Sequence, residues 1–227
     1  MSRSIAMRSN SRVAAWYESV SEGERISSAE ASPHKLAAIV LAAGEGKRLA
    51  QFGPKPFLTC HGKSFLKILA EHLSAIRVNP LVIVTNEVLY QKVVELNPSG
   101  QILINPQPQL GMISSLWIGL NAIDSTVSGF FMCPIDYPLV RPETYHHLAE
   151  AHFAFPHRII IPAHNGHFGH PVIFPKELCE ELKRVPLDQG AKFLIHSQSD
   201  LILPVAVPDP GILININTPE LYQKYCK

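Results

Sequence analysis

The sequence has few of the features that mark secreted, membrane or nucleic-acid-binding proteins. Its four cysteines lie far apart with no C-x-x-C pair, so neither a disulfide framework nor a zinc ribbon is indicated. Apolar runs such as residues 36–43 are well short of the roughly 18 residues that span a bilayer. The formal net charge is only +1, which gives no strong attraction to nucleic acid or anionic membranes. We therefore expect a protein of the reducing cytoplasm that binds small molecules, and neither membrane nor nucleic acid.

The chain has an atypical start and one region able to fold as a domain. Residues 1–34 are rich in serine, arginine and alanine and lack the apolar stretch of a secretory signal. We predict a disordered or loosely docked N-terminal extension there; a transit peptide is the alternative, although four glutamates oppose it. Residues 35–227 carry enough apolar residues for a single core, and we expect one globular domain.

From residue 36 onward, short apolar runs alternate with longer amphipathic segments, which predicts an α/β protein. The predicted strands are residues 36–41, 81–85, 102–104, 129–133, 158–161, 172–174 and 201–207. The predicted helices are residues 64–77, 87–95, 112–123, 142–152, 176–184 and 190–196. Apolar strands joined by helical crossovers predict a single doubly wound, mostly parallel sheet with helices on both faces. Ligands of such sheets bind beyond the carboxyl ends of the strands.

The strongest motif follows the first predicted strand and reads L-A-A-G-E-G-K-R, from Leu41 to Arg48. Gly44 and Gly46 permit a close approach of the backbone, so that N–H groups can converge on phosphate oxygens. Arg48, and Lys55 within a P-K-P segment, add positive charge. The segment fits neither the dinucleotide fingerprint nor the P-loop. It predicts a triphosphate-binding loop, with an ordinary strand-to-helix turn as the alternative.

This loop, followed by P-K-P, resembles the nucleotidyltransferase superfamily, and specifically its molybdenum cofactor cytidylyltransferase-like family. The resemblance spans about residues 36–225. It implies a Rossmann-like nucleotidyltransferase fold and a Mg²⁺-dependent enzyme, with Arg48 and Lys55 as catalytic residues that also bind the nucleotide. The other nucleotide-binding residues implied by the loop are Leu41, Ala42, Ala43, Gly44 and Gly46.

A second segment, N-P followed by G-M-I-S-S-L, also resembles the family. Asn105 is its first residue and Gly111 precedes the predicted helix, whose first turn, with Ser114 and Ser115, offers hydrogen-bond donors to an anion. These four residues are expected to bind the nucleotide, although a simple helix cap is the alternative.

Two residues, one after a predicted strand and one near the C-terminus, are expected to hold the metal ion. Asp136, in P-I-D-Y-P, follows the strand at residues 129–133 and is also expected to be catalytic; it could instead merely cap a helix. Mg²⁺ commonly uses one or two protein oxygens beside waters and substrate phosphates. Asn217 stands in N-I-N-T-P-E, which resembles the closing motif of the family, and it could cap the last helix or ligate the metal.

Two further motifs are expected to bind the acceptor, the molecule that receives the nucleotide. They are G-H-P and D-Q-G-A-K, which resemble G-H-P and D-x-G-A-R in the family. They make His170, Asp188 and Lys192 the expected acceptor-binding residues. Lysine replaces the usual arginine and cannot make its bidentate contact with phosphate. His164, His167 and His170 also have a spacing that could hold zinc, but no cysteine or acid accompanies them.

The resemblance implies transfer of a nucleoside monophosphate to a phosphate-bearing acceptor, molybdopterin above all, with release of pyrophosphate. Leu-Ala-Ala-Gly is typical of cytidylyltransferases and favours CTP over GTP, whereas Asn217 points weakly the other way. A molybdoenzyme is a further possible partner. The alternatives are a sugar- or polyol-phosphate nucleotidyltransferase and a non-catalytic maturation factor that binds a nucleotide or the cofactor.

Overall fold

The computed structural model describes residues 35–227, so the extension expected at residues 1–34 lies outside the described part. The strands are β1 (Lys35–Leu41), β2 (Thr59–Cys60), β3 (Lys63–Ser64), β4 (Leu81–Asn86), β5 (Gln101–Asn105), β6 (Val127–Pro134), β7 (Ile159–His164), β8 (His167–Phe168), β9 (Val172–Pro175) and β10 (Ile202–Ala206). The α-helices are α2 (Phe65–Ala75), α3 (Glu87–Glu95), α4 (Met112–Asn121), α5 (Pro142–Ala154), α6 (Cys179–Leu182), α7 (Ala191–Ser197) and α8 (Pro219–Cys226). None of the helices within residues 35–227 is long and apolar enough to cross a membrane.

One mixed sheet organises the described residues. Its strand order is β10-β7-β9-β6-β1-β4-β5, with β8 paired to β7. The pairs β1–β4, β1–β6, β4–β5 and β10–β7 are parallel, whereas β9 runs antiparallel to both β6 and β7. The predicted doubly wound, mostly parallel α/β sheet is therefore confirmed, with β9 and the short β8, which pairs antiparallel with β7, as the exceptions.

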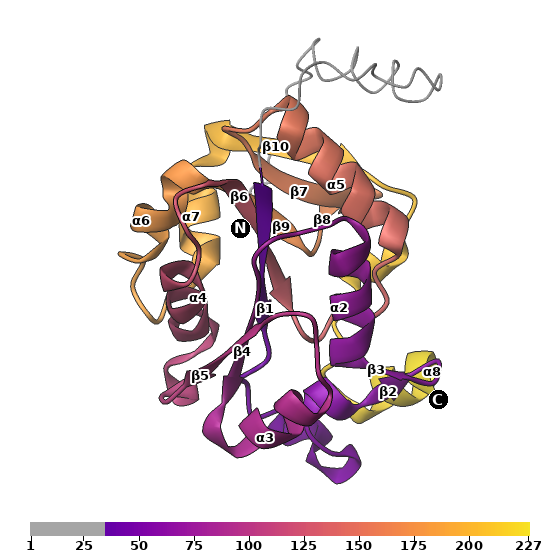
Figure 1. Ribbon diagram of the computed structural model, residues 1–227. Coiled ribbons are helices and arrows are strands. Elements are labelled where there is room, and N and C mark those ends of the chain that lie inside the picture. Colours follow the sequence, from indigo (N-terminus) through magenta and orange to yellow (C-terminus); the bar gives the residue numbers. More distant parts are fainter. Residues whose placement is uncertain (1–34) are drawn as a thin grey trace. The chain divides into compact units, whose positions relative to one another are not determined.

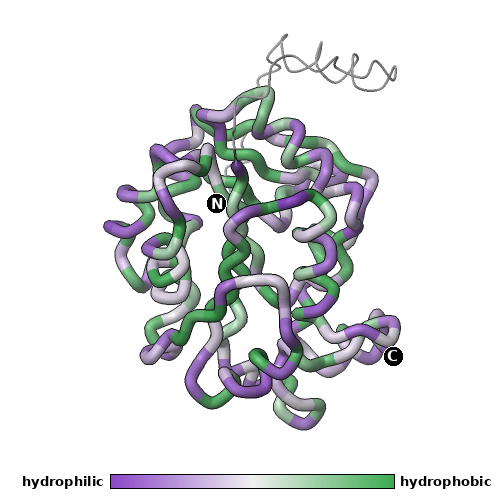
Figure 2. Tube along the Cα trace, viewed as in Figure 1, coloured by the Kyte–Doolittle hydropathy of each residue, from purple (hydrophilic) through white to green (hydrophobic). Residues whose placement is uncertain are grey.

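Helices cover both faces of this sheet. Figure 1 places α4, α6 and α7 on one side and α2 and α5 on the other. Hydrophobic residues concentrate in the central strands and hydrophilic ones in the outer loops (Figure 2). Edge strand β5 is only partly buried, unlike β1 and β4, because no further strand pairs with it in the described chain.

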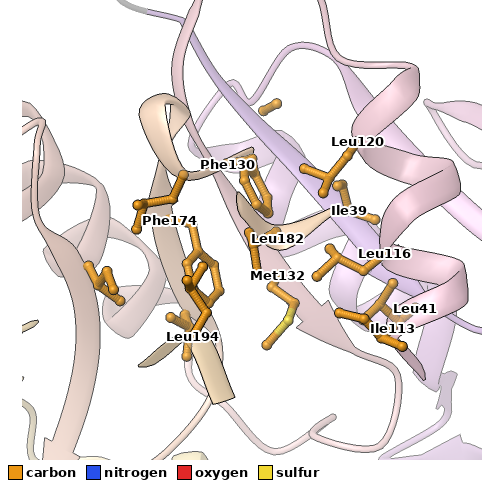
Figure 3. Close-up of a cluster of buried hydrophobic side chains, with 14 of the residues drawn as sticks. Ile39, Leu41, Ile113, Leu116, Leu120, Phe130, Met132, Phe174, Leu182 and Leu194 are labelled. Atoms are coloured by element: carbon orange, nitrogen blue, oxygen red, sulfur yellow. The ribbon is translucent and has the colours of Figure 1, made fainter. Parts of the chain in front are cut away.

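One part of the hydrophobic core lies between the sheet and the helices α4, α6 and α7. Figure 3 shows side chains from β1, β6 and β9 meeting those of α4, α6 and α7. The residues labelled there are Ile39, Leu41, Ile113, Leu116, Leu120, Phe130, Met132, Phe174, Leu182 and Leu194. Gly119 is required in α4 because a Cβ at this position would lie 2.5 Å from the side chain of Ile39. The close packing fixes the beginning of α4 relative to the carboxyl ends of β1 and β6.

The cysteine pattern led to a wrong expectation. Cys60 in β2 and Cys226 in the last turn of α8 form a disulfide, 166 positions apart in the sequence. Cys133 and Cys179 are free. Spacing gave no sign of this pair, because a bond between two distant segments depends only on how the chain folds.

A buried carboxylate joins α5 to the loop after β10. Asp209 is 2% exposed; its Oδ2 accepts hydrogen bonds from the Arg141 amide (2.8 Å) and the Thr144 hydroxyl (2.6 Å). Its Oδ1 accepts from the Gly211 amide (2.9 Å). Three donors compensate the cost of burying this charge, and they hold the turn that leads to the C-terminal segment.

We expect Asp209→Ala to lower the free energy of unfolding by about 2–4 kcal/mol, because it leaves buried donors without their acceptor. Urea denaturation followed by circular dichroism measures this change. Asp200→Ala, at an exposed carboxylate, is the control and should change stability by less than about 0.5 kcal/mol. Equal midpoints for the two variants would contradict the role of Asp209.

Candidate active site

The candidate site lies at the point where the strand order of the sheet reverses. From β1 the chain passes to β4 and then β5 on one side, and it later returns to β6 on the other side of β1. The carboxyl ends of β1 and β6 therefore lie side by side, with Leu41 opposite Pro134. Crevices at such reversal points are where ligands bind in doubly wound sheets.

The glycine-containing loop leaves β1 at this point and is anchored from β4. The Ala42 amide donates to the Val84 carbonyl (2.8 Å), and the Asn86 side-chain amide donates to the Ala43 carbonyl (2.9 Å). Asn86 also caps α3 by accepting from the Leu89 amide (3.0 Å). This supporting residue was missed in the sequence, although an asparagine between a strand and a helix is a recognisable cap signal.

Gly46 ends the loop and makes room for Lys55. It has φ of +61°, and a Cβ here would lie 3.2 Å from Cγ of Lys55. The Lys55 ammonium donates to Oδ2 of Asp136 at 3.0 Å, and both side chains are 15% exposed. Two of the three predicted catalytic residues, Lys55 and Asp136, are therefore in direct contact although 81 positions apart.

A cleft of about 430 Å³ is lined by Lys55 of this ion pair. Its lining residues are Glu45, Gly46, Lys47, Arg48, Lys55, Pro108, Gln109 and Asn217. Lys47 pairs with Glu45 at 2.7 Å on the surface and Lys55 pairs with Asp136, so Arg48 carries the cleft charge that no carboxylate of the described residues pairs. Within residues 35–227 the Arg48 guanidinium has no hydrogen-bond or ion-pair partner. The charge and size of the cleft suit a polyanion.

The C-terminal segment closes one side of this cleft. The Ile216 amide donates to the Asp136 carbonyl at 2.8 Å, which brings Asn217 beside the Asp136 loop. The possibility that Asn217 caps the last helix is wrong, because Thr218 is the N-cap of α8 and accepts from the Leu221 amide (3.4 Å). The side chain of Asn217 belongs instead to the cleft wall.

Asn105, Ser114 and Ser115 are buried together under the beginning of α4. The Asn105 side-chain amide donates to both serine hydroxyls, at 2.8 and 2.9 Å, and Ser114 Oγ donates to the Gly111 carbonyl at 2.7 Å. Gly111, with φ of +91°, begins the helix. This network orders the segment that carries Pro108 and Gln109 into the cleft wall.

A second pocket, of about 530 Å³, is lined by Tyr137, the residue after Asp136, and has a largely apolar wall. Its apolar lining residues are Leu41, Met112, Ile113, Leu116, Met132, Ile161, Phe168, Val172, Leu187, Ala191, Ile195, Ile212 and Leu213. The polar groups include His170, Asp188 and Lys192, the three residues expected to bind the acceptor, together with Tyr137 and His196. Four of the labelled side chains in Figure 3, those of Leu41, Ile113, Leu116 and Met132, belong to this wall.

His170 lies against Tyr137, with ring centroids 4.7 Å apart. Burial lowers the pKa of His170, and the charge of Asp136 opposes this only in part, so the imidazole is neutral at pH 7. Burial also raises the pKa of the Tyr137 hydroxyl, which keeps it protonated. Both side chains can therefore offer uncharged hydrogen-bonding groups to a ligand.

Metal chemistry at the site depends on oxygen ligands. Among residues 35–227, no group of three histidine, cysteine or acidic side chains could hold a metal ion, so the zinc alternative at His164, His167 and His170 is wrong. The Asp136 carboxylate and the neighbouring Asn217 amide are hard oxygen donors in small number. This set fits Mg²⁺ or Mn²⁺ bound together with substrate phosphates.

Solved structures with this fold include Rv0371c from Mycobacterium tuberculosis H37Rv, which superposes with a TM-score of 0.74 at 21% identity, covering 85% of this chain and 97% of that one. Its complex with manganese gives 0.64 at 21% identity, covering 77% and 88%. The nucleotidyl transferase Mth528 from Methanothermobacter gives 0.68 at 20% identity, covering 84% and 95%. The molybdopterin-guanine dinucleotide biosynthesis protein A from Archaeoglobus fulgidus gives 0.59 at 19% identity, covering 83% and 95%.

These likenesses agree with the fold described above. A comparison with curated proteins finds no match. Residues 38–201, most of the chain and including the loop, Asp136 and the apolar pocket's polar residues, match a family described as the MobA-like NTP transferase domain. The chain belongs to this family of nucleotidyltransferases.

Proposed function

We propose that the protein transfers a nucleoside monophosphate, from CTP in preference to GTP, to the terminal phosphate of molybdopterin. The observation that carries this proposal is that Asp136 is linked, through Lys55 and Tyr137, to two hollows of different character. Asp136 pairs with Lys55 of the cationic cleft, and the next residue, Tyr137, lines the apolar pocket. A triphosphate and an acceptor bound in these two hollows would meet at Asp136.

The donor half of the reaction is assigned to the cationic cleft. Backbone N–H groups around Gly44 and Gly46 would cradle the β- and γ-phosphates, with Leu41, Ala42 and Ala43 shaping the base site. Arg48 and Lys55 would stabilise the charge that builds on the transferring and leaving groups. Asn105, Gly111, Ser114 and Ser115 would act by fixing the segment that carries Pro108 and Gln109 of the cleft wall.

In the reaction, an acceptor phosphate oxygen attacks the α-phosphorus, a new P–O bond forms, and pyrophosphate leaves with the electron pair of the broken bond. Such transfers need positioning and charge stabilisation more than a protein nucleophile. Asp136 and Asn217 would hold a divalent ion, proposed to be Mg²⁺, which supplies charge neutralisation at the phosphates. The manganese complex of Rv0371c is consistent with a divalent ion in this fold.

The acceptor half is assigned to the apolar pocket. A sugar or polyol phosphate would leave many hydroxyl groups against an apolar wall without hydrogen-bond partners, which is unfavourable. A phosphate-bearing heterocycle such as molybdopterin fits this wall better, with its phosphate near Lys192 and its polar edge near His170 and Asp188. The product would then pass to a molybdoenzyme.

Pyrophosphate release over a panel of triphosphates and acceptors tests the proposal. We expect release with CTP and molybdopterin, with a higher kcat/KM for CTP than for GTP. Release with a sugar or polyol phosphate and silence with every molybdopterin species would overturn the acceptor assignment. A triphosphate that binds but is never cleaved would favour a non-catalytic maturation factor.

Lys192→Ala should raise the KM for the acceptor by about 10- to 100-fold while changing the KM for CTP little, because it removes a charged hydrogen-bond donor from the acceptor pocket alone. Steady-state kinetics with each substrate varied in turn measures both constants. Lys183→Ala is the matched control, since Lys183 pairs with Glu180 and does not line the pocket. Acceptor KM values that coincide for the two variants would remove Lys192 from acceptor binding.

A further inference from the structure

The Cys60–Cys226 disulfide joins two segments that both lead to the donor cleft. Cys60 is 1% exposed and lies five positions after Lys55. Cys226 is partly exposed and lies nine positions after Asn217. The bond therefore connects, by two short stretches of chain, two residues that both line the cleft, Lys55 and Asn217.

Helix α8 is held by few other contacts. Only Tyr222 is buried in it, and its ring lies 5.0 Å from that of Phe52 and 6.2 Å from that of Phe65. Phe52 ends the short helix η1 (Lys47–Phe52), which carries Arg48. Helices of this length are marginal on their own, so the disulfide is expected to contribute much of the energy that keeps α8 in place.

The segment before α8 transmits this restraint to the metal ligands. The Ile216 amide hydrogen bond to the Asp136 carbonyl fixes the position of Asn217, and the cap at Thr218 connects both to the helix. If α8 were released, local unfolding of the segment that holds Ile216 and Asn217 would cost less free energy. The reason is that this cost depends on the contacts that a region retains.

We propose that Cys60–Cys226 is a redox-sensitive positioning bond that holds the donor cleft in its binding-competent form. This inference rests on the proposed triphosphate role of the cleft. Reduction by a dithiol proceeds by two exchanges. A thiolate attacks Sγ of the more exposed Cys226, the Cys60 thiolate leaves, and the second reagent thiolate then displaces Cys226. Two electrons pass from the dithiol to the protein, which gains two thiols while the reagent becomes a disulfide.

Two measurements on the full chain, before and after reduction with dithiothreitol, test this role. The first is hydrogen exchange by mass spectrometry, which should accelerate by at least about tenfold in residues 215–226, with the Ile216 amide as the most direct reporter. The second is the Kd for CTP with Mg²⁺, which should rise about tenfold, within the usual range for coupling between two sites.

Matched variants separate this bond from other effects of the reductant. The double variant Cys60→Ser/Cys226→Ser should show the fast exchange and weak binding of the reduced protein and should not respond to dithiothreitol. Cys179→Ser removes a free, partly exposed cysteine and should respond like the unchanged protein.

Unchanged exchange, or an unchanged Kd for CTP, in protein whose reduction is verified by mass would overturn the proposal. So would the absence of the bond in protein purified without reductant. If neither CTP nor GTP binds in either redox state, the proposed function fails. Exchange at Ile216 then still decides whether the bond holds the segment beside Asp136.

Discussion

Replacing Asp136 by alanine is expected to lower pyrophosphate release by about 10³-fold, because the proposed metal ion would lose the one carboxylate assigned to it. Affinity for CTP should change by less than about tenfold, since the ammonium of Lys55, released from its ion pair, remains available to the phosphates. Stopped turnover with retained binding is the signature of a catalytic metal ligand. Pyrophosphate release and equilibrium binding of CTP measure the two effects.

Asp124→Ala is the matched control for this variant, because Asp124 is an exposed carboxylate on the loop between α4 and β6. It should keep full activity. If Asp136→Ala retained turnover within a few-fold of the unchanged protein, the metal assignment at Asp136 would be wrong. An unchanged protein that releases no pyrophosphate at all would instead support the carrier alternative.

The second large effect is expected at Arg48. Arg48→Ala should lower kcat by about 10²–10³-fold, the scale for loss of one preorganised charge-stabilising donor. The guanidinium is exposed and lines the donor cleft, so its removal should leave folding intact. Single-turnover kinetics with saturating CTP and acceptor separates this loss from weaker binding.

Arg184→Ala serves as the control, because this exposed arginine lies after α6 and does not line the donor cleft. Circular dichroism should show both variants folded. A value of kcat for Arg48→Ala equal to that for Arg184→Ala would exclude Arg48 from the mechanism.

Most of the sheet could be predicted from the sequence because its main strands are short, nearly continuous apolar runs. The expected strand at residues 81–85 is β4, and the one at residues 36–41 is β1, each within one residue. The antiparallel direction of β9 could not be predicted, since an apolar run does not show whether its strand runs parallel or antiparallel to the neighbouring strands. The two-residue strands β2 and β3 are too short to give an alternating pattern.

The candidate site was predictable to the extent that its residues follow strands. Loops at the carboxyl ends of parallel strands share one edge of the sheet, which explains why Lys55 and Asp136 meet although distant in sequence. The direction in which a side chain points is not encoded in a motif. Ser114 and Ser115 were expected to face an anion, yet their hydroxyls meet Asn105 in a buried network.

The disulfide and Asp209 show the same limit. Both depend on contacts between segments far apart in the chain, Cys60 with Cys226 and Asp209 with the start of α5. Neither an isolated cysteine nor an aspartate before a proline signals such a partner. Only the folded arrangement of the sheet and its C-terminal segment brings these groups together.

The most direct test of nucleotidyl transfer is the fate of labelled phosphorus in CTP incubated with the protein, Mg²⁺ and molybdopterin. Label in the α-phosphate should appear on the acceptor, and label in the γ-phosphate should appear in pyrophosphate, each in amounts equal to the product formed. Label from the γ-phosphate on the acceptor, or released as free phosphate, would contradict the assignment of the cationic cleft and Asp136 to attack at the α-phosphorus.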